Sequence, residues 1–383
     1  MVINKGINAI KTISSDFVQL YKREIDFYKA VPRHALLFLT FRCTSKCRAC
    51  TMWKRIVNEK DELNLQQWKN IIKDLSVNGV KIIELFGGDV FLRKELTVEL
   101  IKYSNELGMV VHMPTNAILL DEETIQEIVD AGLHTLYISV DEIDKNHDKI
   151  RGTKGNFDHI IKSIVNLKKV RSLKGSKRPT VYCNTTISKL NIDSIEEIVS
   201  FAHKQNFDVC ALEYIGEFTE VHVKRSRIDG IYPDPYFLLR GESLLLNNDQ
   251  AKKLKKTVPK LIKKYKYSDT EMYTLNIDTL SKKNIVSGTV PNTKCYMERN
   301  QVTVDPYGNI IACPFFSNYK LGNLSATPLQ DIWNNKTHLR FREQQNKNTL
   351  KMCSHCIMGV ERNYNIIKGM QRIYYKRIHE KLI

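Results

Sequence analysis

The chain has 383 residues, of which 42% are hydrophobic, and this length and composition allow one large α/β domain together with a smaller one. No apolar run approaches the roughly 20 residues that a membrane-spanning helix needs, and residues 1–30 lack the pattern of a secretory signal. The formal net charge of +17 favours acidic partners. No segment interleaves aromatic and basic residues, however, so stable nucleic-acid binding is not expected.

The cysteine content indicates reduced thiols. Nine cysteines, an odd number, occur in a chain without a secretory signal, which favours metal binding over a disulfide framework. We therefore expect a cytoplasmic protein. The amphipathic segments at 1–32 and 361–383 are predicted to form a helical N-terminal extension and a C-terminal helix. We expect these two helices to pack against the rest of the fold rather than to associate with a membrane.

Residues 33–215 alternate short β-rich runs with amphipathic helical patterns, which is typical of βα units around a parallel sheet. The predicted strands are 35–41, 81–86, 109–114, 135–140, 179–187 and 208–214, and the predicted helices are 65–78, 96–107, 122–131, 157–172 and 193–205. The expected helix ends carry Asn64, Asp121, Asn156 and Asp193 as N-caps and Gly79 and Gly132 as C-caps. Six such strands predict a partial (β/α)6 TIM-like barrel, in which the chemistry collects at the C-terminal ends of the strands.

The rest of the chain does not continue this alternation of strand and helix patterns. Residues 216–290 contain a stretch rich in Pro and Asp and a lysine-rich helical stretch, and we interpret them as a connecting segment that covers the mouth of the barrel. Residues 291–360 are predicted to form a small second domain of a β-hairpin and helix. Within it, 302–311 has turn residues between β-branched runs, as a hairpin requires.

Three cysteines, Cys43, Cys47 and Cys50, follow directly on the first predicted strand. Cubane iron–sulfur clusters are normally held by four cysteines, one per iron, so a C-x3-C-x2-C loop leaves one iron free for a small molecule. Zinc is the alternative, but a structural zinc site needs four ligands and this loop offers no fourth Cys or His. Three unrelated buried thiols are the remaining interpretation, which the tight spacing disfavours.

Short motifs at the ends of the later strands extend this pattern. They are Gly87-Gly88-Asp89 after the second strand, Thr115-Asn116 after the third, Ser139-Val140-Asp141 after the fourth, and Arg151 ten residues later. Together with the three cysteines, these motifs resemble the radical S-adenosylmethionine (SAM) enzymes over roughly residues 33–215. The order of the motifs and their placement at strand ends make the resemblance specific.

The resemblance implies a SAM site beside a 4Fe-4S cluster held by the three cysteines. Gly87, Gly88 and Asp89 match the motif that holds the SAM amino group, with Asp in place of the family's Glu and therefore one methylene shorter. Ser139 and Arg151 match contacts near the SAM carboxylate and ribose. The remaining residues assigned to this cofactor pocket are Asn116 and Asp141.

Cys295, Cys313, Cys353 and Cys356 form a second constellation, in which the first two flank the predicted hairpin and the last two form a C-x2-C pair. On ligand count alone, four thiolates fit zinc and a 4Fe-4S cluster equally well. The pattern resembles the twitch domain, the shorter relative of the SPASM domain, which implies one auxiliary 4Fe-4S cluster. Residues 357–362 contain no further cysteine, so two auxiliary clusters are not expected. The two cysteines left over, Cys183 and Cys210, lie in predicted strands and are predicted to be buried core thiols.

The resemblance implies an enzyme that reductively cleaves SAM to a 5′-deoxyadenosyl radical and abstracts hydrogen from an unactivated C–H bond. The favoured hypothesis is an oxidoreductase acting on a small polar molecule (a sugar, cyclitol or nucleotide-derived alcohol), with the auxiliary cluster as electron acceptor. A second hypothesis is modification of a peptide or protein side chain, and a third is a non-catalytic metal-binding scaffold or redox sensor. A reductant such as flavodoxin or ferredoxin is an expected partner. No catalytic acid or base is identified.

Overall fold

A single ten-stranded sheet organises the protein. The computed structural model describes residues 31–239, 241–291, 295 and 300–359. Within them the strand order is β10-β9-β8-β1-β2-β3-β4-β5-β6-β7. Neighbours from β8 through β1 to β7 are parallel, whereas β9 is antiparallel to both β8 and β10. The strands are β1 (His34–Thr40), β2 (Ile82–Gly87), β3 (Val110–Thr115), β4 (Thr135–Ser139), β5 (Thr180–Ile187), β6 (Val209–Tyr214), β7 (Glu271–Tyr273), β8 (Gln301–Val304), β9 (Asn309–Ile311) and β10 (Lys320–Asn323).

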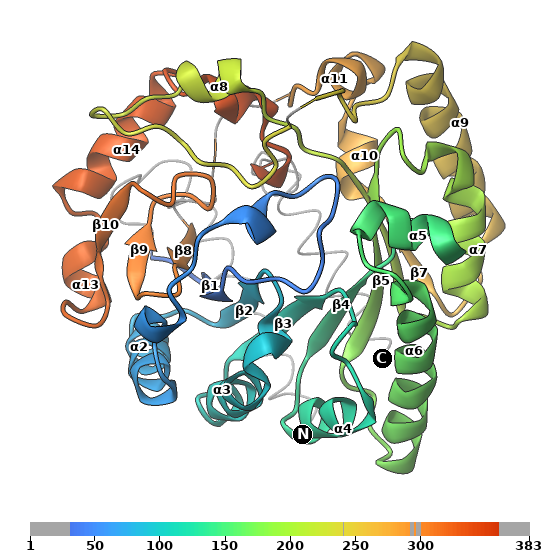
Figure 1. The fold of residues 1–383 in the computed structure, drawn as a ribbon, viewed down its shortest axis with the longest axis horizontal. Coiled ribbons are helices and arrows are strands. Elements are labelled where there is room, and N and C mark those ends of the chain that lie inside the picture. The colour runs from blue at the N-terminus through green and yellow to red at the C-terminus, as the bar shows by residue number, and fades with distance from the viewer. Residues whose placement is uncertain (1–30, 240, 292–294, 296–299, 360–383) are drawn as a thin grey trace, which may run out of the picture.

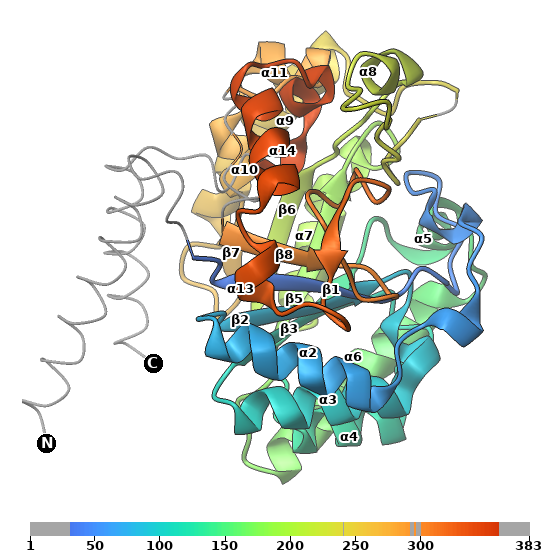
Figure 2. The ribbon, with the colours of Figure 1, turned by 90° about the vertical axis from the view of Figure 1, so that its left-hand side faces the viewer.

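The parallel strands curve into a partial barrel with α2, α3, α4, α6 and α7 on its outer side (Figures 1 and 2). The helices of the barrel are α2 (Leu65–Val77), α3 (Lys94–Glu106), α4 (Glu122–Asp130), α5 (Asp144–Arg151), α6 (Asn156–Leu173) and α7 (Ile195–Lys204). The later helices are α8 (Glu220–Lys224), α9 (Asn248–Lys264), α10 (Leu275–Thr279), α11 (Lys282–Ser287), α13 (Leu329–Ile332) and α14 (Lys336–Asn346). None of the described helices is long and apolar enough to cross a membrane.

Helix α2 shows how local sequence produces these elements. Asn64 and Gln67 form a capping box, in which each side chain accepts a hydrogen bond from the other residue's backbone N–H and so satisfies donors that the first turn leaves free. The buried residues Trp68, Ile71, Ile72 and Leu75 repeat at helical spacing and place one apolar face against the sheet.

The predicted helix ends are confirmed in part. Asp121 caps α4 through a bond from Thr124 N–H, and Gly79 and Gly132 follow their helices at positive φ, as C-terminal glycines do. The N-caps of α6 and α7 are Gly155 and Ser194, so the predictions of Asn156 and Asp193 are each wrong by one position. Asn156 is instead used inside the fold, where its side chain donates to the Asn116 carbonyl oxygen at 2.7 Å.

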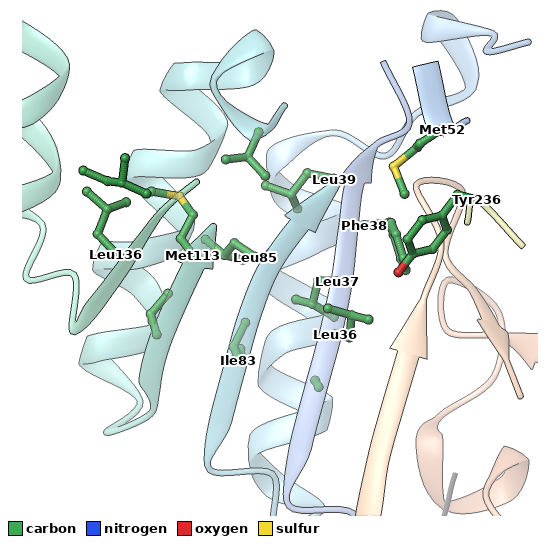
Figure 3. Packing of buried hydrophobic residues seen from close by; sticks show 14 of the residues in the cluster. Leu36, Leu37, Phe38, Leu39, Met52, Ile83, Leu85, Met113, Leu136 and Tyr236 are labelled. Carbon is green, nitrogen blue, oxygen red and sulfur yellow. The ribbon is translucent and has the colours of Figure 1, made fainter. Parts of the chain in front are cut away.

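The main core lies between the sheet and the outer helices. On β2 to β5 buried and partly buried residues alternate, and the buried set packs with the apolar faces of the helices. Figure 3 shows Ile83, Leu85, Met113 and Leu136 of this set. The partly buried set therefore faces the interior of the barrel.

The predicted fold class, a partial (β/α)6 barrel followed by a hairpin region, is confirmed. Two features of the sheet go beyond the prediction. The short strand β7 lies inside the connecting segment and pairs with β6, and the hairpin strand β8 pairs with β1, so the hairpin continues the barrel sheet. The predicted helices at 1–32 and 361–383 fall almost entirely outside the described residues, and the domain boundaries remain predictions.

Candidate functional site

The loop that carries Cys43, Cys47 and Cys50 leaves the C-terminal end of β1, as predicted, and all three thiols are partly exposed. Backbone hydrogen bonds fasten this loop to α5. The N–H of Lys46 donates to the Arg151 carbonyl oxygen at 3.1 Å, and the N–H of Arg48 donates to that of Ile150 at 3.0 Å. The loop therefore has a fixed path between β1 and α5.

Two of these thiols accept backbone hydrogen bonds. Ser45 N–H lies 3.4 Å from Cys43 Sγ, and Met52 N–H lies 3.4 Å from Cys50 Sγ. Burial raises the pKa of Cys43 to about 12 and that of Cys50 to about 11, so both thiols keep their protons at neutral pH until a metal displaces them. Hydrogen bonds to the cluster sulfurs and the exposure of the cluster to solvent are among the factors that set the reduction potential of an iron–sulfur cluster.

Gly87 and Gly88 occur where β2 passes against the cysteine loop. A Cβ atom on Gly88 would lie 2.0 Å from the Arg42 carbonyl oxygen and 2.8 Å from Cys43 Cβ, and one on Gly87 would lie 2.4 Å from the Thr40 carbonyl oxygen. Only glycine allows this approach of two backbones. The motif therefore shapes the loop that presents the first cysteine.

The side chains of Asp89 and Asn116 also contact the loop. Asp89 accepts from Thr44 Oγ1 at 2.5 Å and from the backbone N–H of Phe91 at 3.2 Å, and its burial raises its pKa. Asn116 Nδ2 donates to Thr44 Oγ1 at 2.8 Å and to Ser45 Oγ at 2.9 Å. Both predicted cofactor residues thus hold the loop in place in this structure.

Arg151 joins the cysteine loop to the end of β4. Its Nη2 lies 2.7 Å from Asp141 Oδ2, and its Nη1 lies 3.9 Å from Cys47 Sγ. Burial lowers the pKa of Arg151, but the Asp141 carboxylate and the sulfurs of Cys47 and Cys50 together outweigh this and raise it above its usual value. Its Nε is sealed from solvent without a hydrogen-bond partner. An unpaired, permanently charged donor at this place fits an anionic group such as the SAM carboxylate.

Ser139, the remaining predicted cofactor residue, ends β4 and is partly exposed on the inward face of the barrel. The structure therefore brings Asp89, Asn116 and Arg151 to the cysteine loop by direct contacts. Asp141 reaches the loop only through Arg151, and Ser139 lies at the adjoining strand end.

The second cysteine group also comes together. The pKa of Cys313 lies well above its usual value, mainly because the thiol is buried. The sulfurs of Cys356, Cys295 and Cys353 raise this pKa further, because the four thiols lie near one another. Within the described ranges no three Cys, His, Asp or Glu side chains converge on a single ion position. A cubane cluster binds each cysteine on a different iron and does not require such convergence. Cys183 and Cys210 are buried and directly opposite each other on β5 and β6, which confirms them as core thiols.

Through Asp234, a residue that the sequence analysis did not single out, the connecting segment contacts the segments that follow Cys50 and Cys313. Asp234 Oδ2 accepts from Arg55 Nη2 at 2.7 Å, and its Oδ1 accepts from the backbone N–H of Ser317 at 2.7 Å. Next to it, Thr51 N–H donates to the Tyr236 carbonyl oxygen at 2.7 Å. The pairs are separated by 179 and 83 residues, so no spacing in the sequence could have revealed them.

Comparisons with known proteins agree with this geometry. The sequence profile of the Radical SAM superfamily matches residues 37–202, and that of the SPASM iron–sulfur cluster-binding domain matches residues 295–357. The chain belongs to the radical SAM superfamily and carries a C-terminal SPASM domain. Its cofactors are accordingly SAM and 4Fe-4S clusters, including auxiliary iron–sulfur binding in the SPASM domain.

The chain is also similar to individual curated proteins and, in its fold, to solved structures. It is 31% identical over 188 residues to Fe-coproporphyrin III synthase of Methanosarcina barkeri, covering 46% of this chain and 45% of that protein. It is 32% identical over 123 residues to PqqA peptide cyclase of Bradyrhizobium diazoefficiens, covering 32% of each. These matches span less than half of either relative's length. The crystal structure of Streptococcus suis SuiB bound to S-adenosylmethionine shares the fold, with a TM-score of 0.62, 17% identity and coverage of 86% of this chain and 74% of that one.

Proposed function

We propose that this radical SAM protein is an enzyme that binds SAM at the open iron of a cluster held by Cys43, Cys47 and Cys50. The observation that carries the proposal is the unpaired Nε of Arg151, which lies beside the cysteine loop in a place sealed from solvent. When bound and reduced, the cluster supplies the electron that cleaves SAM to a 5′-deoxyadenosyl radical, which abstracts hydrogen from an unactivated C–H bond.

The protein's own residues then have distinct tasks. Arg151, held by Asp141 at 2.7 Å, orients the carboxylate end of SAM. Asp89 and Asn116 hold the cysteine loop in place and position the amino end of SAM. The connecting segment, tied to the loop through Asp234 and Tyr236, excludes water from the mouth of the barrel. Ser139, at the end of β4, contributes to the ribose side of the pocket.

Cys295, Cys313, Cys353 and Cys356 hold one auxiliary 4Fe-4S cluster in this proposal. Four cysteines ligate a cubane completely and leave no iron open for SAM. Such a cluster would be suited to electron transfer. By accepting the electron that a substrate radical loses as it releases a proton, it would make the net reaction an oxidation. This supports an oxidoreductase that acts on a small polar molecule.

Modification of a peptide is the second candidate function. It is favoured by the similarity to PqqA peptide cyclase, whose name states a peptide substrate. The similarity to Fe-coproporphyrin III synthase supports the small-molecule candidate in the same way. The two candidates share the SAM site and differ only in what occupies the barrel.

The test is SAM turnover by anaerobically reconstituted protein with dithionite, read as 5′-deoxyadenosine by mass spectrometry. We expect the product from the wild type and none from a triple variant with Cys43, Cys47 and Cys50 changed to Ala. Cys183→Ala is the matched control, because it removes a buried thiol outside both groups and is expected to keep the activity. Turnover that survives in the triple variant would contradict the cluster assignment.

A further inference from the structure

A buried carboxylate, that of Glu62, lies at the base of the cysteine loop and is not part of the site described above. Its side chain is 2% exposed. Oε1 of Glu62 accepts a hydrogen bond from Thr40 Oγ1 at 2.5 Å. Oε2 lies 3.1 Å from Arg42 Nη2 and 3.7 Å from Arg93 Nη1. A carboxylate that is removed from water needs such partners, because burying an unpaired charge is costly.

Arg42 is the residue directly before Cys43, and its side chain is folded back onto the end of β1. Its Nε and its backbone N–H donate to Thr40 Oγ1 at 3.2 and 3.1 Å. Because Thr40 Oγ1 itself donates to Glu62, the three residues form a closed set of hydrogen bonds. This set fixes the path of the chain where it enters the cysteine loop.

The backbone of Arg42 extends this restraint to the motif that follows β2. Its carbonyl oxygen accepts a hydrogen bond from Asp89 N–H at 2.8 Å, and a Cβ atom on Gly88 would lie 2.0 Å from the same oxygen. The Asp89 side chain in turn accepts from Thr44 Oγ1 at 2.5 Å. The peptide group between Arg42 and Cys43 therefore influences the position of the first cysteine and of Asp89 together.

The chain around Glu62 is itself held on two sides. The next residue, Leu63, donates its N–H to the Pro306 carbonyl oxygen at 2.9 Å, in the turn between β8 and β9. The Leu63 carbonyl oxygen accepts from Arg93 Nη2 at 2.6 Å, and Arg93 Nη1 also donates to the Leu39 carbonyl oxygen at 2.9 Å. The hairpin turn and β1 thus hold the buried carboxylate in place.

Two carboxylates contact the Arg42 guanidinium, and they differ in exposure. Glu59 Oε2 lies 2.9 Å from Arg42 Nη1, but the Glu59 side chain is 64% exposed. Exposed ion pairs contribute little, whereas removing one partner of a buried pair leaves a charge without compensation. Partial burial lowers the pKa of Arg93, Glu62 opposes this effect and Arg42 adds to it, as expected of charges that share one space. Glu62 is therefore the partner on which the buried part of this cluster depends.

We propose that Glu62 is a positioning residue for the SAM site, which holds Cys43 and Asp89 in place through Arg42. Glu62 acts through Arg42 rather than by contact with SAM. It fixes the loop before SAM binds, so that less conformational freedom is lost on binding. The inference rests on the proposed SAM site and adds to it a residue from outside the strand-end motifs.

The test compares Glu62→Gln with the wild type in the reconstituted full-length protein. Gln has the same size but carries no charge for Arg42 and Arg93. We expect the dissociation constant of SAM, measured by equilibrium dialysis with labelled SAM, to rise about tenfold, which corresponds to about 1.4 kcal/mol. In the protein without iron, amide hydrogen exchange of residues 42–50 should become faster, because the loop opens more often.

Two further variants show whether the effect passes through Arg42. Arg42→Gln should raise the dissociation constant about as much as Glu62→Gln, and the double variant should raise it no further, because both changes break the same contact. Glu59→Gln is the matched control, since it removes the exposed carboxylate from the same guanidinium, and we expect a change of less than about twofold. Iron content and thermal unfolding show whether each variant is folded.

An unchanged dissociation constant in folded, iron-loaded Glu62→Gln, an equal rise in Glu59→Gln, or additive effects in the double variant overturns the proposal. If Glu62→Gln binds no iron, the hydrogen exchange of residues 42–50 decides, and unchanged exchange overturns it. A wild-type protein that binds no labelled SAM refutes the proposed function instead. A wild type that binds SAM no more tightly than Glu62→Gln refutes only the role of Glu62.

Discussion

Arg151 and Asp141 form an ion pair with 2.7 Å between Nη2 and Oδ2, and this pair connects the cysteine loop to the end of β4. Asp141 is itself fixed, because its Oδ1 accepts from the backbone N–H of Thr186 at 2.9 Å. The guanidinium is thus held by one carboxylate while its Nε stays unpaired. Two residues that the sequence placed at separate motifs act as one unit in the site.

Replacing Arg151 by Lys keeps the positive charge but removes the planar fork. We expect the dissociation constant of SAM to rise by about 10- to 100-fold, because a point charge cannot bond Asp141 and a carboxylate with the same geometry. Arg171→Lys is the matched control, since Arg171 pairs with Asp208 at 2.8 and 3.3 Å away from the site. Equilibrium dialysis with labelled SAM measures both, and equal effects would refute a role in SAM binding.

Adding a methyl group at Gly88 should displace the cysteine loop. The new Cβ would lie 2.0 Å from the Arg42 carbonyl oxygen, which the backbone can relieve only by moving. We expect Gly88→Ala to lose most of the iron bound by the barrel cysteines, measured as iron and sulfide content after reconstitution. Gly175→Ala meets no atom within 4 Å and is expected to lose only about 1 kcal/mol of stability from its positive φ. Full iron content in Gly88→Ala would show that the loop tolerates the shift.

The ion pair of Asp234 and Arg55 should stabilise the contact between the connecting segment and the cysteine loop. Burial raises the pKa of Asp234, and Arg55 and the Ser317 donors oppose this effect. We expect Asp234→Asn to lower the free energy of unfolding by about 1–3 kcal/mol, measured by urea titration. The exposed pair of Asp193 and Lys253, at 2.7 Å, gives the control Asp193→Asn, for which less than about 1 kcal/mol is expected. A smaller loss in Asp234→Asn than in the control would refute this role.

Stability should fall in mild acid because of His147. Burial lowers its pKa to about 4, and its neutral ring accepts the Asp141 N–H and contacts Asn156 Oδ1 at 3.1 Å. The pKa of His147 is near 6.5 in the unfolded chain and about 4 in the folded protein, so between these pH values only the unfolded chain binds the proton. The contribution of His147 to the free energy of unfolding is therefore full above pH 6.5 and is lost as the pH falls towards 4.

The loss attributable to His147 reaches about 3 kcal/mol at pH 4. His147→Gln should remove this part of the pH dependence, and urea titrations of both proteins at pH 7 and pH 5 measure it. An identical change in the free energy of unfolding between the two pH values in wild type and variant would contradict the assignment.

The sequence predicted the parts of the fold that depend on local patterns. The helix that begins at Leu65 follows from a capping box and apolar spacing, and the six barrel strands follow from β-rich runs between such helices. The resemblance of the strand-end motifs to those of radical SAM enzymes singled out Asp89, Asn116, Asp141 and Arg151. The structure brings Asp89, Asn116 and Arg151 to the cysteine loop and pairs Asp141 with Arg151. The prediction failed by one residue at Asn156, whose side chain bonds the Asn116 carbonyl oxygen instead, and at Asp193, which lies in the 3-10 helix Ile192–Ser194 directly before α7.

By itself, then, the sequence determined the family, the order of the βα units and the cysteine ligands that we propose, because these are encoded in short spacings. Tertiary structure alone decided that β8 continues the barrel sheet beside β1, that Asp234 joins the connecting segment to the loop, and that the Asn156 side chain bonds the Asn116 carbonyl oxygen. Such contacts join residues far apart in the chain. They depend on strand register and on the closing of the sheet, and neither leaves a local pattern in the sequence.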